Sequence, residues 1–148
     1  MSTYSFQDVQ ASITGPGGNF ALGYGQATAK EGISIQRAAN KNTMLVGSDG
    51  EGMHSLHPDK SGTITLRYLK TAPINQKLMA LATAQAVSST LWGQNVITVT
   101  QKASGDLTTG RQCAFQKIPD LNYAEDGDVV TWVFDVIKID TMLGAYQQ

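Results

Sequence analysis

The chain has 148 residues, of which 41% are hydrophobic, so residues 1–148 are expected to form a single domain with a full-sized core. Its net charge of −1 excludes a strongly basic nucleic-acid binder. Only 16% of the residues are charged, against about 25% in average domains, and such a surface favours a protein that lies in contact with other protein.

The sequence shows no targeting or membrane segment. The N-terminal stretch MSTYSFQDVQ lacks the charged and apolar regions of a secretory signal, and no apolar run approaches the ~18 residues of a membrane span. We therefore expect a protein that is kept in a cytoplasm-like compartment and does not insert into membranes.

Alternation of apolar and polar residues predicts strands through the first half of the chain. Residues 3–14 are expected to form the first strand, bent near Gln7 and Asp8 where the apolar residues change face. The glycine- and proline-rich segment 15–18 predicts a turn, and residues 23–32 predict a loop. The other strands expected here are residues 20–22, 33–37 and 44–46.

A long polar, glycine-rich loop is expected at about residues 47–60. A loop of this length inside a compact domain is uncommon and is usually functional or disordered. Met53 and Leu56 are apolar residues with no obvious place in the subunit's own core. The loop is therefore expected to bind something.

The strand pattern continues after this loop and is interrupted once, by a helix. In residues 62–69 the apolar residues Ile64, Leu66 and Tyr68 share one face, which predicts a half-buried strand. Pro73 predicts the start of a helix at about residues 73–88. Its apolar face is expected to comprise Ile74, Leu78, Leu81, Ala82 and Gln85.

Three more strands are expected after the helix, at residues 95–101, 108–118 and 129–139. Trp132 is expected in the core, and Cys113 is expected to be a small buried side chain rather than a nucleophile. The last strand is apolar on both faces, which predicts that it is covered on both sides. Together the elements predict a mostly β fold, an antiparallel β-sandwich or barrel of two packed sheets with one peripheral α-helix.

Residues that could carry catalysis or bind a cofactor are few. His54 and His57, with Asp59 nearby, are too few for a closed metal shell, and a loop holds ligands poorly. The sequence has no nucleophile elbow, and its glycine clusters do not match a phosphate-binding loop. We therefore expect no enzyme activity, no cofactor and no metal, and an assembly protein is favoured.

Several segments in order along the chain resemble one family of phage structural proteins. They are the opening YSFQDVQASITGPGG, the passage MHSLHPDKSGT, and the closing WVFDVIKID. The chain is similar to the tail tube proteins of contractile-tailed bacteriophages over nearly its whole length. That family is related in fold to the tube proteins of type VI secretion.

The resemblance implies a task for the protein. Tail tube subunits form hexameric rings that stack into a hollow tube, and the genome passes through its lumen after the sheath contracts. The implied partners are further copies of the chain, the tail sheath, the baseplate and the tail terminator, while genomic DNA passes without specific binding. The protein would be part of the virion tail, assembled in the cytoplasm of the host bacterium.

Two alternatives remain open. One is a ring-forming tail terminator or baseplate adaptor, and the other is a β-barrel ligand-binding module. In the tail tube reading, the candidate interface residues between subunits or rings are Gly50, Met53, His54, Leu56, His57 and Asp59. The candidate lumen residues are Thr63, Thr65, Thr98 and Thr100, because small uncharged hydroxyls offer phosphates few fixed charges.

Overall fold

The computed structural model describes residues 2–146, and strands dominate it. Between residues 2 and 146 no helix is long and apolar enough to cross a membrane. The elements are a 3-10 helix η1 (Phe6–Asp8), the strands β1 (Val9–Gly15), β2 (Gly18–Ala21), β3 (Thr28–Arg37), β4 (Asn42–Val46), β5 (Gly52–Leu56) and β6 (Gly62–Leu69), the helix α1 (Ile74–Gln85), and the strands β7 (Asn95–Gln101), β8 (Asp106–Phe115) and β9 (Val129–Met142).

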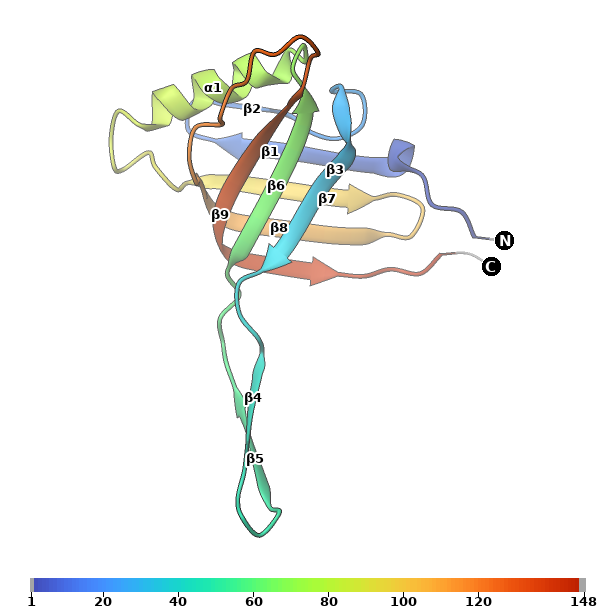
Figure 1. Ribbon diagram of the computed structural model, residues 1–148, viewed down its shortest axis with the longest axis vertical. Helices are drawn as coiled ribbons and strands as arrows, with labels where there is room; N and C mark the ends of the chain where they lie inside the picture. Colours follow the sequence, from blue (N-terminus) through green and yellow to red (C-terminus); the bar gives the residue numbers. More distant parts are fainter. Residues whose placement is uncertain (1, 147–148) are drawn as a thin grey trace.

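One antiparallel sheet of seven strands forms the body, in the order β2-β1-β7-β8-β9-β6-β3. The sheet curls on itself, so that β3 and β6 cross in front of β1, β7 and β8 (Figure 1). β9 joins the two halves, since Val129–Val136 pair with β6 and Phe134–Met142 pair with β8. The expected antiparallel, mostly β fold with one helix is confirmed, and its two layers belong to one continuous sheet.

The core lies between the two halves of the curled sheet. Alternation directs Ile64, Leu66 and Tyr68 of β6 inward, and all three are fully buried. The halves are in direct contact, because a Cβ on Gly110 of β8 would meet Ile64 Cδ1 at 3.0 Å. The Tyr68 hydroxyl donates to the carbonyl oxygen of Leu22 at 2.6 Å, which satisfies the polar end of this buried ring.

Helix α1 lies at the edge of the body, behind the upper end of β6 in Figure 1. Its buried residues are Ile74, Leu78, Leu81, Ala82 and Gln85, as its spacing predicts. Pro73 is the N-cap residue. The helix ends at Gln85 rather than near residue 88, because Ser88 accepts a hydrogen bond from the N–H of Thr90 and directs the chain into a turn.

Several predicted boundaries are wrong. Residues 6–8 form a 3-10 helix rather than the start of a strand, since the Ser5 hydroxyl accepts a hydrogen bond from the N–H of Gln7. β3 begins at Thr28, inside the expected loop 23–32. β8 ends at Phe115, three residues short of the expected Ile118.

The second face of β9 is less covered than its apolar pattern predicts. Trp132, Phe134 and Val136 are buried in the core, but Ile137 on the other face is 58% exposed. The alternation of buried and exposed residues shifts by one position after Val136, where pairing with β6 ends. Ile139, rather than residue 138, is therefore the next buried residue. Any cover for the second face must come from outside the described residues.

Candidate assembly interface

The prediction of a long loop at residues 47–60 is wrong. Most of this segment belongs to a β-hairpin that projects from the body (Figure 1). We call residues 42–56, β4 and β5 with their turn, the arm. The two strands pair from Asn42 with Leu56 to Val46 with Gly52. Gly50 has a φ of +90°, and the N–H of Glu51 donates to Asp49 Oδ1 at 3.1 Å. The glycines therefore form a tight turn rather than a long loop.

Apolar side chains stand exposed on both faces of the arm. In an antiparallel pair, residues opposite each other share a face, so Met44, Val46 and Leu56 lie on one face and Leu45 and Met53 lie on the other. Leu56 is the most exposed, at 83%. Met53 and Leu56 are therefore outside the core, as predicted. The interface residues predicted from the sequence do not include Met44, Leu45 and Val46 of β4, although these form an apolar run just before the glycine-rich turn.

The two histidines are hydrogen-bonded within the arm and at its root. His54 Nδ1 lies 3.1 Å from Asn42 Nδ2, and His57 Nε2 lies 2.7 Å from Thr43 Oγ1. Between residues 2 and 146, no three His, Cys, Asp or Glu side chains form a group that could hold a metal ion. Asp59 lies at the root of the arm, where hydrogen bonds with the Ser61 side chain and with the Ser61 N–H lower the pKa of its carboxyl.

The two threonine faces point to opposite sides of the body. Thr63 and Thr65 alternate with the buried residues of β6, and Thr98 and Thr100 alternate with buried Ile97 of β7. The inward faces of these strands share one core, so their outward faces point away from each other. Only one of the two faces of a subunit can therefore line a single channel.

The two outward faces also differ in charge. On the outward face that holds Thr63 and Thr65, strand pairing places Arg67, which donates to the Ser34 hydroxyl at 2.9 Å. The face that holds Thr98 continues through Thr109 to β9. At its β8–β9 side this face carries Arg111, Lys138 and Asp140.

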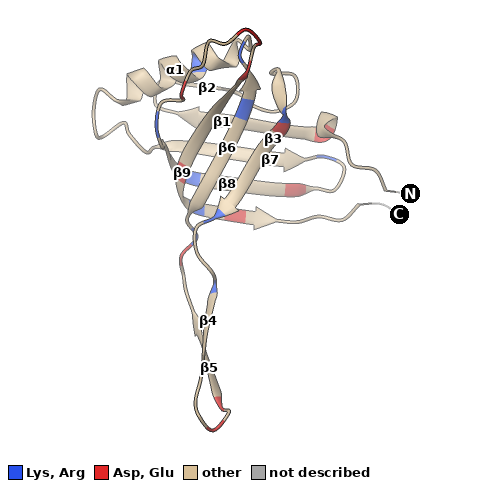
Figure 2. Ribbon diagram, in the orientation of Figure 1, with Lys and Arg blue, Asp and Glu red and all other residues tan. Residues whose placement is uncertain are grey.

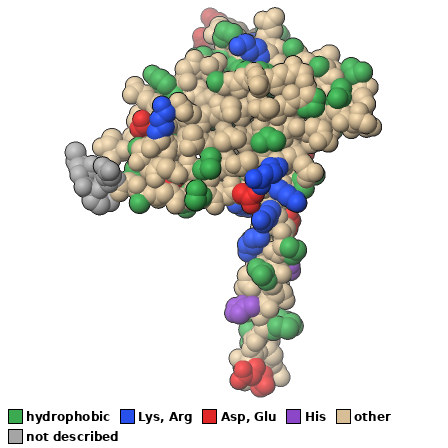
Figure 3. Space-filling model, turned by 180° about the vertical axis from the view of Figure 1, so that it is seen from behind, with side chains coloured by type: hydrophobic (Ala, Val, Ile, Leu, Met, Phe, Trp, Pro, Cys, Tyr) green, Lys and Arg blue, Asp and Glu red, His purple; other side chains and the backbone are tan. Residues whose placement is uncertain are grey.

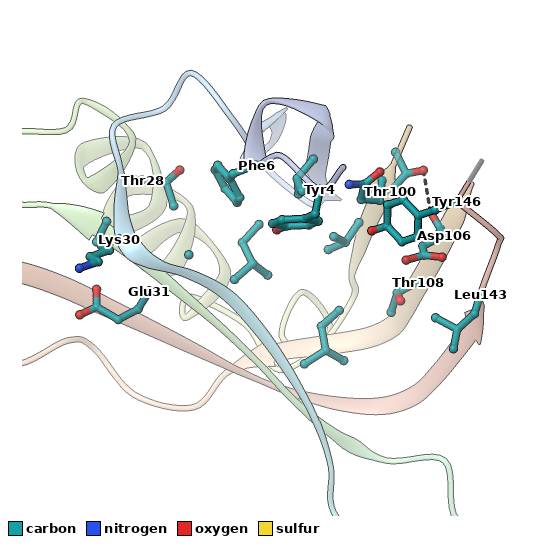
Figure 4. Close-up of a pocket in the computed structure, with 17 residues that line it drawn as sticks. Tyr4, Phe6, Thr28, Lys30, Glu31, Thr100, Asp106, Thr108, Leu143 and Tyr146 are labelled. Atoms are coloured by element: carbon teal, nitrogen blue, oxygen red, sulfur yellow. Dashed lines mark hydrogen bonds between the residues drawn. The ribbon is translucent and has the colours of Figure 1, made fainter. Parts of the chain in front are cut away.

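A cavity of about 530 Å³ opens at the edge of the curled sheet, between β3 and the end of β7 (Figure 4). The terminal segments contribute Tyr4, Phe6, Leu143 and Tyr146 to its lining. Gln101 also lines it, and the Nε2 atom of this buried side chain has no hydrogen-bond partner within residues 2–146. The volume is in the range of small-molecule pockets, which is the feature expected of a ligand-binding module.

The lone cysteine is chemically inert. Cys113 is fully buried, and this burial raises the pKa of its thiol to about 11. The reactive thiolate is therefore scarce at neutral pH. Cys113 is a small core side chain, as predicted.

Comparison with known families identifies the chain. Residues 1–144 match the profile of the bacteriophage PhiTE tail tube protein family. The chain belongs to this tail tube family. The resemblance found in the sequence is confirmed, and the expectation that the chain is not an enzyme is confirmed with it, because this family consists of structural tube proteins. Membership also makes the chain a structural component of a virion tail.

Solved structures share the fold of this tail tube family member at low sequence identity. A chain in the sheath/tube terminator of PVC, an extracellular contractile injection system, is 10% identical with a TM-score of 0.66, and the match covers 96% of this chain and 98% of that one. A chain in the baseplate of the anti-feeding prophage is 9% identical with a TM-score of 0.60, covering 96% and 97%. A chain in the PVC sheath-tube complex is 12% identical with a TM-score of 0.55, covering 90% and 88%. No curated protein matches the chain significantly.

Proposed function

We propose that the chain is the repeating subunit of a phage tail tube, in which hexameric rings stack and the lumen conducts the genome during ejection. The observation that carries the proposal is the family match over residues 1–144, joined to an arm whose apolar side chains are exposed on both faces. The implied partners are further copies of the chain, the sheath, the baseplate and the terminator. Assembly takes place in the host cytoplasm, and the product is part of the virion.

The arm needs contact with another molecule. An isolated two-stranded hairpin is marginally stable in water, and the subunit body covers neither face of this one. Contact with neighbouring subunits or rings would bury its five apolar side chains, Met44, Leu45, Val46, Met53 and Leu56. A ring uses head-to-tail contacts, so the arm and its docking surface are different parts of the subunit.

The β6 face is the better candidate for the lumen wall. Clustered Lys and Arg bind DNA phosphates, so a channel that DNA crosses without specific contacts should lack them. Thr63 and Thr65 lie beside one cation that is already hydrogen-bonded, whereas the face with Thr98 and Thr100 leads to Arg111 and Lys138. We therefore assign Thr63 and Thr65 to the lumen, and Thr98 and Thr100 to the outside.

Removal of the arm tests the proposal. Lys41 and His57 are already hydrogen-bonded across the root, from the His57 N–H to the Lys41 carbonyl at 2.9 Å, so deleting residues 42–56 joins neighbouring positions. Purified full-length protein should form rings and tubes by negative-stain microscopy, and the deleted protein should be a folded monomer. A full-length protein that stays monomeric at high concentration in light scattering, or a deleted one that polymerises normally, would contradict the proposal.

A tube-end protein is the second candidate. It is favoured by the structural likeness to a terminator chain, whose TM-score of 0.66 exceeds the 0.55 of the sheath-tube chain. A terminator or adaptor should form single rings that do not stack on one another. The same micrographs therefore separate the two candidates by the presence or absence of tubes longer than one ring.

A further inference from the structure

Five cations surround the root of the arm. Figure 3 shows a group of blue side chains where the arm leaves the body. We call this group the basic collar, and it holds five of the chain's 11 Lys and Arg residues. Its members are Arg37, Lys41, Lys60, Arg111 and Lys138.

The collar is only partly neutralised within the subunit. Asp140 accepts hydrogen bonds from both Lys60 and Arg111, and these two cations lower the pKa of its carboxyl. Arg37 and Lys41 donate to backbone carbonyls and to one hydroxyl, which carry no charge.

Lys138 has a cation as its cross-strand neighbour, because it lies directly opposite Arg111 in the β8–β9 register. Like charges at such positions repel each other. No ion pair of Lys138 occurs within residues 2–146. The arrangement favours an anionic partner from outside the subunit.

Unpaired carboxylates stand at the opposite end of the molecule. All residues of the turn 125–128 before β9 are exposed. The turn carries Glu125, Asp126 and Asp128, and we call it the acidic turn. Figure 2 shows it at the top of the long axis, while the collar lies at the lower edge of the body, where the arm leaves it. In the described part of the chain none of these three carboxylates forms an ion pair.

The two cations near the acidic turn are otherwise engaged. Lys117 pairs with Asp120 at 3.3 Å, and Lys70 donates to the Asn122 carbonyl and lies over the Tyr123 ring. The turn therefore remains available to cations of another molecule. Opposite charges at the upper and lower edges of one subunit body are the pattern that a repeating head-to-tail contact requires.

We propose that the basic collar of one subunit binds the acidic turn of a second copy in the next ring. This inference rests on the proposed function, because it assumes stacked rings, and it names the surfaces that meet and the direction of stacking. The contact is heterologous and repeats along the tube axis. Its pairs are exposed, so the strength should come from their number around the ring and should fall with salt.

A charge-swap experiment tests this contact. One variant reverses the collar with Lys60→Glu, Arg111→Glu and Lys138→Glu, which leaves two cations against three new carboxylates and Asp140. Another variant reverses the turn with Glu125→Lys and Asp126→Lys. Each variant then carries charge of the same sign on its collar and on its turn, so each alone should form rings that do not stack. An equal mixture should regain tubes, because every collar again meets a turn of opposite sign. Lys30→Glu with Lys77→Glu and Lys102→Glu changes three exposed cations away from the collar, so it is matched in net charge to the collar variant, and its tubes should be normal.

The outcomes separate this inference from the proposed function. Wild-type protein without rings or tubes would contradict the proposed function. Wild-type tubes together with a collar variant that still stacks normally, or with a mixture that fails to restore stacking, would overturn the inference alone. If collar reversal abolishes binding of duplex DNA while stacking persists, the collar is a nucleic-acid site and the inference is overturned.

Discussion

At the residue scale, a buried pair of amides joins helix α1 to the sheet. Gln85 Nε2 donates to Asn95 Oδ1 at 2.6 Å, and Asn95 Nδ2 returns a hydrogen bond to Gln85 Oε1 at 2.9 Å. The remaining N–H groups donate to the carbonyls of Pro16 and Cys113. The pair is fully satisfied although both side chains have no exposed surface.

Asn95→Leu should therefore lower the free energy of unfolding by about 1–3 kcal/mol, because it leaves the Gln85 amide partly unpaired in the core. The double variant Gln85→Leu with Asn95→Leu should lose less than the sum of the two single variants, since it removes both partners. Urea unfolding of the four proteins measures this coupling. Additive losses would show that the two amides act independently.

At the scale of elements, the root of the arm depends on a close approach of strands. Gly62 pairs with both Arg37 of β3 and Val136 of β9. A Cβ there would overlap the carbonyl oxygen of Gln36 and meet Ile139 Cδ1 at 2.7 Å. A backbone oxygen cannot move aside as a side-chain end can, so only glycine fits where the arm leaves the body.

Gly62→Ala should destabilise the body by about 1–3 kcal/mol, the usual range for overpacking a tight site. Gly127→Ala is the matched control, since nothing lies within 4 Å of its added Cβ, and it should change stability by less than about 0.5 kcal/mol. Thermal or urea unfolding of both variants gives the comparison. Equal stabilities would mean that β3 and β6 separate easily at this point.

Sequence patterns predicted the elements that are buried on one face. The alternation around Thr63 and Thr65 and the apolar spacing of α1 both report contact with the core, and the structure agrees with each. The arm was predicted only in part: the strand expected at residues 44–46 lies in β4, but β5 was expected to be loop. Both faces of the arm are exposed, so its strands lack the alternation that burial imposes, and Gly50 suggested a loop. What the arm contacts is a property of the assembly.

At the scale of the whole molecule, the sequence did not predict on which side of the body each threonine face lies. Thr65 and Thr98 have the same local pattern, a hydroxyl that alternates with buried aliphatic residues. They lie on opposite sides of the body only because β9 carries the sheet around the core. That relation depends on pairing between distant strands, and no local pattern contains it.

These two positions give a direct test of the lumen assignment. Thr65→Cys and Thr98→Cys should both react with a thiol reagent in free subunits, because each side chain is partly exposed. In assembled tubes, a reagent too bulky to enter the channel should label Thr98→Cys quickly and should spare Thr65→Cys. The native Cys113 gives little background, since it is buried and its pKa is about 11. The reverse pattern would place the β7 face in the lumen, where DNA would pass the cations beside it.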